Sequence, residues 1–111
     1  MAMTHMAPGQ ARSVRPLAQQ LRDSKTAALF KSQDLEVIRL VLRAGSGVPP
    51  HKVSGEMTIH CLEGCLELRI DDALVRLYPG ELLFLKRLQR HALQAVEDSS
   101  ALITMVLHHA H

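Results

Sequence analysis

Hydrophobic positions fall into short runs along most of the chain, and turn-forming residues separate the runs. From residue 26 onward the runs are rich in Leu, Val and Ile and have the length of β-strands. They predict strands over residues 26–31, 35–42, 57–62, 65–70, 74–77, 82–85, 92–96 and 102–107. About eight strands without an interleaved helix predict an all-β protein, built as an antiparallel sandwich, jelly roll or small barrel.

The first residues show no such pattern. Residues 1–14 are small or polar, with Pro8 and Gly9 among them, and predict a flexible N-terminal arm. Pro16 suits the first turn of a helix, and Leu17 and Leu21 stand four residues apart, so one short helix is expected there. Residues 15–111 are predicted to form a single barrel domain.

The predicted strand over residues 35–42 carries apolar side chains at both odd and even positions. One face of this strand should therefore line the interior, while the other should meet a second layer. A second copy of the chain supplies that layer most economically, so we predict a homodimer. The alternative is that the N-terminal arm and helix cover the outer face.

The amino-acid composition limits the classes of molecule that the protein is expected to bind. The chain has 111 residues, of which 47% are hydrophobic but only 3% aromatic, so its core is aliphatic and offers few platforms for stacking bases or sugars. The net charge is +2, and neither a nucleic-acid nor a membrane partner is indicated. Cys61 and Cys65 are expected to be buried and reduced. Together with the lack of a long apolar segment, they favour a cytoplasmic protein.

Gly45, His51 and Gly64 recur at a spacing that resembles the first motif of the cupin superfamily, Gly-x5-His-x-His-x3,4-Glu-x6-Gly. Val53 and Met57 stand where that motif has its second His and its Glu. The frame of the motif is thus retained, while two of its metal ligands are replaced.

Gly80 and His91 resemble the second cupin motif, Gly-x5-Pro-x-Gly-x2-His-x3-Asn, in which Lys86, Leu88 and Ala95 replace the other residues. Fifteen residues separate the two motifs, as in small single-domain cupins. The resemblance covers residues 35–107 and implies an RmlC-like jelly-roll barrel, also described as a double-stranded β-helix.

In metal-binding cupins, three His and one Glu hold a divalent ion inside the barrel. The resemblance carries over two of these ligands, His51 and His91, so any divalent transition metal is expected to be held weakly. Met57 is a soft thioether that would favour Cu(I). Glu56 points to the opposite face unless a bulge near Gly55 turns it inward.

Further residues are expected around the same cavity. Strand alternation places Ile59 and Cys61 on the face of Met57, so these three side chains and Val53 are predicted to contact a ligand. The histidines retain an alternative interpretation, in which His51 is a solvent-exposed loop residue.

Charged side chains near the barrel mouth suggest an anionic ligand. Lys86 and Arg90 flank His91 and predict a cationic rim, unless they belong to a solvated surface loop. Arg39 is a candidate inward charge, which would need Glu81 or a ligand carboxylate as its partner.

Three functions remain open at this point. The favoured hypothesis is a barrel that binds a small, partly apolar and anionic molecule. The alternatives are a metal-dependent enzyme of the dioxygenase or isomerase type, and a non-catalytic dimeric interaction module. His108, His109 and His111 form a C-terminal cluster that could take up metal adventitiously, and no function is assigned to it.

Overall fold

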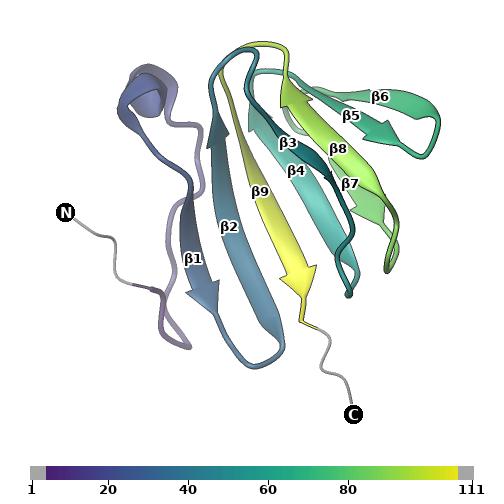
Figure 1. Ribbon diagram of the computed structural model, residues 1–111. Coiled ribbons are helices and arrows are strands. Elements are labelled where there is room, and N and C mark those ends of the chain that lie inside the picture. The colour runs from purple at the N-terminus through teal and green to yellow at the C-terminus, as the bar shows by residue number, and fades with distance from the viewer. Residues whose placement is uncertain (1–4, 108–111) are drawn as a thin grey trace.

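Two antiparallel β-sheets face each other and enclose the interior of the protein (Figure 1). The computed structural model describes residues 5–107. Within them, one sheet has five strands in the order β1-β2-β9-β4-β7, and the other has four in the order β3-β8-β5-β6. The strands are β1 (Ala27–Lys31), β2 (Leu35–Leu42), β3 (Gly47–His51), β4 (Met57–Glu63), β5 (Leu66–Ile70), β6 (Ala73–Leu77), β7 (Leu82–Leu85), β8 (His91–Ala95) and β9 (Ser99–Val106). The predicted all-β jelly roll is confirmed.

The core is aliphatic and lies between the sheets. Along β4, Met57, Ile59 and Cys61 are buried while the residues between them are partly exposed, as the alternation of side chains across a strand requires. Leu68 and Leu85 join them from β5 and β7. Each fully buried Leu or Ile contributes about 1.5–3 kcal/mol, so this shared interior holds the two sheets together.

Strand β3 was not predicted, because residues 45–50 look like a loop rich in Gly and Pro. The structure places it at the edge of the four-stranded sheet, where it pairs only with β8. An edge strand has one side without a partner, so Pro49 and Pro50 interrupt few ladder hydrogen bonds there. The pairing sets His51 opposite His91 in the backbone register.

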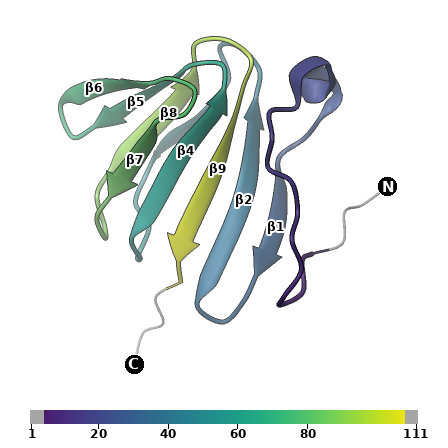
Figure 2. The same ribbon diagram turned by 180° about the vertical axis from the view of Figure 1, so that it is seen from behind.

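The short N-terminal helix is present as the 3-10 helix η1 (Ala18–Asp23). The described residues before it run alongside β1 and β2, as Figure 2 shows from behind. The Met6 N–H donates to the Leu29 carbonyl at 2.8 Å, which ties this arm to the edge of the five-stranded sheet. The flexibility of the N-terminal arm stays a prediction. No helix in residues 5–107 is long and apolar enough to cross a membrane.

Two glycines of the cupin-like frame mark turns with a left-handed backbone. Gly64 has φ +84° and Gly80 has φ +88°, a region that favours glycine. At Gly64 a Cβ atom would also collide with Ser99 and the Asp98 carbonyl, whereas at Gly80 it would meet open space. The backbone demands glycine at both positions, but packing demands it only at Gly64.

Candidate functional site

A cavity of about 160 Å³ lies between the two sheets. We call it the barrel cavity. Five strands contribute to its wall, which is aliphatic except for two thioethers and one imidazole. The lining residues are Ile38, Leu40, Val48, Met57, Ile59, His91, Leu93, Ile103 and Met105. Among these described residues, His91 alone carries a side-chain nitrogen or oxygen, so it is the single polar contact the wall offers.

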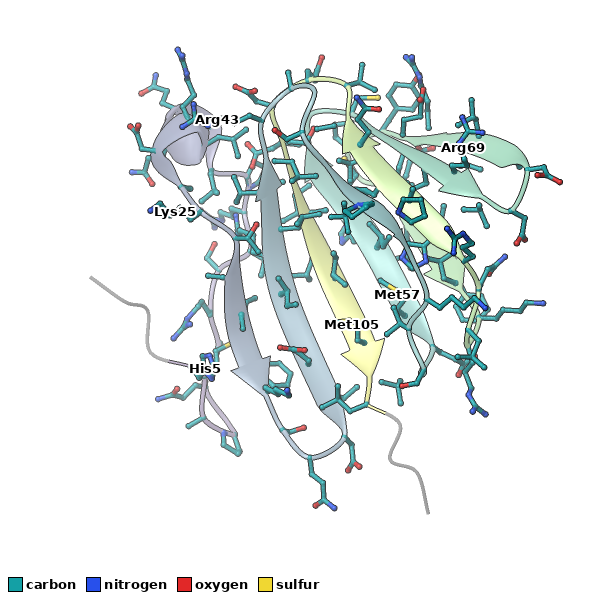
Figure 3. The ribbon with its side chains drawn as sticks, viewed as in Figure 1. His5, Lys25, Arg43, Met57, Arg69 and Met105 are labelled. Atoms are coloured by element: carbon teal, nitrogen blue, oxygen red, sulfur yellow. The ribbon has the colours of Figure 1, made fainter. Side chains whose placement is uncertain are left out.

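The two methionines of the wall are neighbours. Met57 on β4 and Met105 on β9 are register partners, and Figure 3 shows them on adjacent strands, facing the second sheet. Thioether side chains are flexible and polarisable, so they adapt to the shape of an apolar guest. This half of the cavity is the part best able to adjust to a ligand.

His91 begins β8 and is 3% exposed. Its Nδ1 lies 3.0 Å from the Gln89 carbonyl oxygen. A carbonyl can only accept a hydrogen bond, so Nδ1 carries the proton, and in the neutral ring the lone pair is on Nε2. Such an imidazole is fixed in orientation by its own chain. Nε2 is therefore the acceptor nitrogen of the ring.

The overall arrangement matches solved structures closely. It superposes on a conserved protein of unknown function from Streptococcus pyogenes with a TM-score of 0.78 and 26% identity, covering 99% of this chain and 100% of that one. A cupin superfamily protein from Desulfitobacterium hafniense gives a TM-score of 0.75 at 18% identity, with 87% and 94% covered. The chain has the cupin fold.

More distant neighbours of this fold include enzymes. A salicylate 1,2-dioxygenase from Pseudaminobacter salicylatoxidans gives a TM-score of 0.62 at 18% identity, covering 65% of this chain and 21% of that one. No protein family model matches the sequence, and no curated protein matches it. The neighbours therefore support a cupin barrel and leave its specific role to be argued from its own residues.

The cupin metal site is not reproduced by the residues that are described. Val53 and Met57 replace two ligands, and Glu56 is exposed, so it does not replace the lost carboxylate. In residues 5–107, apart from the side chain of His51, which lies outside the described part, no group of three His, Cys, Asp or Glu residues is placed to hold a metal ion. One imidazole beside two thioethers does not fit a hard divalent cation, which selects carboxylate oxygens. The predicted pair of His51 and His91 stays a prediction, and the C-terminal histidines 108, 109 and 111 lie outside the described residues.

Cys61 lies on the inner face of the cupin barrel, as predicted, but it is packed into the core and does not line the cavity. Burial, aided by the nearby Cys65, raises the pKa of the Cys61 thiol to about 11. Its S–H donates to the Glu63 carbonyl at 3.6 Å. A buried neutral thiol of this kind is neither a nucleophile nor a metal ligand at neutral pH. Val53 likewise packs against the core outside the cavity wall.

Arg39 corrects the prediction of an inward charge. Its neighbours Ile38 and Leu40 line the barrel cavity, so alternation turns Arg39 to the outer face of the sheet. There it is 8% exposed, and its guanidinium donates to the carbonyls of Arg15 at 2.8 Å and Ser13 at 3.4 Å. Arg39 thus anchors the N-terminal arm.

Lys86 and Arg90 are both exposed, and neither lines the barrel cavity. They lie in a solvated surface loop, which was the alternative interpretation of these charges. Their loop is fastened to the barrel by a hydrogen bond from the Leu88 N–H to the Val53 carbonyl at 2.8 Å. The cationic rim is therefore absent from the part of the cavity wall that the structure describes.

Glu63, at the end of β4, is a connecting residue that the sequence did not reveal. Its carboxylate accepts hydrogen bonds from the N–H groups of Leu17 at 2.9 Å and Ala18 at 3.0 Å, and from the Ser100 hydroxyl. Partial burial opposes ionisation, but these hydrogen bonds and the charge of Arg39 hold the pKa of Glu63 below its usual range. This carboxylate fixes the start of η1 to the barrel.

Proposed function

We propose that this cupin barrel binds a small, mainly apolar molecule in the barrel cavity, with His91 hydrogen-bonding the polar end of the ligand. The observation that carries the proposal is the lining itself, in which one oriented imidazole stands among aliphatic and thioether side chains. Apolar walls supply affinity without direction, while a single polar group fixes orientation.

Volume limits the size of this ligand. The cavity of about 160 Å³ is close to an engineered protein cavity of about 150 Å³ that binds benzene. It is well below the roughly 300–1,000 Å³ of sites that enclose drug-sized molecules. A ligand about the size of a single six-membered ring with one oxygen substituent satisfies both the volume and the imidazole.

The enzyme alternative receives less support from the residues. A metal-dependent reaction of the dioxygenase or isomerase type needs a strongly held ion, and positions 53 and 57 offer Val and Met where cupin ligands are expected. Elemental analysis of protein purified without an affinity tag separates the two functions. The binding function predicts less than about a tenth of an equivalent of transition metal per chain, and one equivalent would favour the enzyme.

Calorimetric titration with phenol and benzene tests the binding function. We expect saturable binding of both, and we expect Ile103→Phe to abolish it, because the added ring fills the cavity. Leu102→Phe is the matched control, since the neighbouring side chain on β9 faces the opposite side of the sheet. Absence of binding to the unmodified protein, or equal binding by Ile103→Phe, would refute the proposal.

The role of His91 can be measured separately. In His91→Leu we expect phenol to bind about 5–10-fold more weakly, the equivalent of one hydrogen bond, while benzene binding changes little. An equal change for both ligands would show that His91 acts through packing alone.

We also propose that a second copy of the chain covers part of the outer face. Leu82 and Phe84 on the edge strand β7 are 65% and 61% exposed, side by side with the partly exposed His60 of β4. Phe84→Lys should shift the mass measured by light scattering from dimer to monomer, while Leu74→Lys on the other sheet should not. A concentration-independent monomer of the unmodified chain would contradict this assembly.

A further inference from the structure

A second and larger cavity lies outside the barrel, between the N-terminal arm and the outer face of the five-stranded sheet. We call it the arm cavity. Its volume is about 700 Å³, and it shares no lining residue with the barrel cavity. Arg12 and Leu17 border it from the arm, and Ala27, Leu29 and Arg39 border it from β1 and β2. Lys25, which Figure 3 labels, lines the cavity near η1.

The arm cavity is electropositive. Three cationic side chains, those of Arg12, Lys25 and Arg39, line it, and Asp23 is the one carboxylate among the described lining residues. Glu63 also interacts with Arg39, but its carboxylate already accepts three hydrogen bonds from the start of η1 and from Ser100. An excess of positive charge at a partly enclosed site favours an anionic guest.

The two arginines differ in how their donors are used. Arg39 donates through both terminal nitrogens to carbonyls of the arm. The Nη1 of Arg12, by contrast, is buried and has no hydrogen-bond partner among the residues that the structure describes. A buried guanidinium donor without an acceptor has lost its hydration and gained nothing in exchange. Arg12 also lines the arm cavity, so a ligand oxygen that draws the guanidinium toward the cavity would supply the missing acceptor.

We propose that the arm cavity binds a small organic carboxylate, whose oxygens accept from Arg12 and whose hydrocarbon part lies against Leu17, Ala27 and Leu29. A carboxylate matches the planar donor fork of a guanidinium. The apolar side chains of the same wall favour a hydrocarbon tail over a bare inorganic anion. The volume lies within the usual range of small-molecule sites.

Such a ligand bridges two parts of the chain. Arg12 belongs to the arm, whereas Ala27 and Leu29 belong to β1, so the bound molecule contacts both walls. Binding therefore adds its free energy to the docking of the arm on the barrel. The arm should exchange its amide protons more slowly when the site is filled.

Titration with hexanoate, followed by calorimetry, tests this site, with inorganic phosphate and hexanol as comparison ligands. We expect saturable binding of hexanoate, at least tenfold weaker binding of phosphate and of hexanol, and at least a tenfold loss of hexanoate affinity in Arg12→Gln. Arg22→Gln is the matched control, because Arg22 is an exposed arginine of η1 outside the cavity wall. Ile103→Phe, which fills the barrel cavity, should bind hexanoate as the unmodified protein does.

Several results would overturn the proposal. They are the absence of hexanoate binding, equal binding by Arg12→Gln, phosphate or hexanol binding as tightly as hexanoate, and loss of hexanoate binding in Ile103→Phe. The melting temperature without ligand provides an independent measurement. It should stay the same or rise in Arg12→Gln, because the removed donor had no described acceptor, and a clear fall would assign Arg12 a purely structural role.

Discussion

The barrel cavity and the arm cavity are built on opposite faces of the same sheet, and they differ in what forms their walls. Strands of both sheets form the wall of the barrel cavity, and the imidazole of His91 is the one polar side chain among its described lining residues. The arm cavity has one wall made by β1 and β2 and another made by a segment without regular structure, and its wall carries several charges. A site between sheets is fixed by the fold itself, whereas a site under an arm exists only while the arm is docked.

Because of this difference, substitutions at the two sites should change the stability of different parts of the protein. The walls of the barrel cavity are part of the core, so the loss of a side chain there should lower the stability of the whole protein. The arm is held by a few hydrogen bonds to Glu63, Arg39 and Leu29, so damage there should release the arm and leave the barrel intact. The following variants test this separation, beginning with the largest expected effect.

Ile59→Ala should lower the free energy of unfolding by about 2–5 kcal/mol, because Ile59 is almost completely buried and lines the barrel cavity. Leu17→Ala, in the wall of the arm cavity, should cost only about 1 kcal/mol because this side chain is already partly exposed. Urea unfolding followed by circular dichroism measures both. Equal costs would show that the arm is as much a part of the core as β4.

Gly64→Ala should destabilise the protein by roughly 2 kcal/mol or more, since it combines a positive φ with a collision against Ser99 and Asp98. Gly80→Ala has nearly the same φ and open space around it, and should cost only about 1 kcal/mol. The two variants share the backbone strain of a positive φ, but only at position 64 does the added Cβ atom also collide with neighbouring atoms. Thermal unfolding of the two variants under the same conditions measures the difference.

Glu63→Gln should weaken the docking of the arm by about 1 kcal/mol, because the amide offers one acceptor oxygen in place of two and carries no charge. Hydrogen exchange should accelerate at the amides of Leu17 and Ala18 and stay unchanged along β4 and β9. Glu67→Gln makes the same chemical change in an exposed ion pair with Arg76 and serves as the control. Faster exchange throughout the barrel would contradict the separation.

Acid should release the arm through the same carboxylate. The pKa of Glu63 is lowered in the folded protein from its ordinary value of 4.5, so its stabilisation is complete above that value and is lost as the pH falls through the lower, folded value. The exchange rates of the Leu17 and Ala18 amides, corrected for intrinsic rates, should stay flat down to about pH 4.5 and rise below it. In Glu63→Gln this rise should be absent.

The strands could be predicted from the sequence because their patterns are local. Seven of the eight predicted runs agree with the observed strands to within one residue at both ends. The predicted start of the last strand fell at residue 102, whereas β9 begins at Ser99, because two buried serines do not resemble core residues. Strand β3 was missed because its prolines are allowed only by its place at an edge, which no local pattern reveals.

The orientation of Arg39 shows where pattern reasoning ends. Arg39 alternates with Ile38 and Leu40 along β2, but β2 is apolar on both faces, so the sequence did not decide which face points inward. The decision comes from the pairing of β2 with β9 and the packing of the two sheets. The outer face is covered in part by the arm, as the alternative to a dimer anticipated.

The arm cavity could not be predicted at all. Arg12 stands in a segment without periodicity, and Glu63 meets Leu17 and Ala18 across about 45 residues of sequence. Only the two-faced pattern of β2 signalled that something must cover its outer side. The barrel cavity was partly predicted, since His91, Met57 and Ile59 line it, whereas Leu93, Ile103 and Met105 belong to no motif.

The consecutive prolines of β3 also affect how the protein behaves in crowded solution. Pro49 and Pro50 have no N–H group. Because the N–H groups of successive strand residues point to opposite edges, one of the two prolines removes a donor from the outer side that a passing extended chain would meet. Aggregation through sheet extension requires an uninterrupted row of donors and acceptors, and this edge cannot provide one. Replacing both prolines would thus allow the strand of another chain to pair with this edge. The first measurable effect would be a lower solubility limit with an unchanged fold.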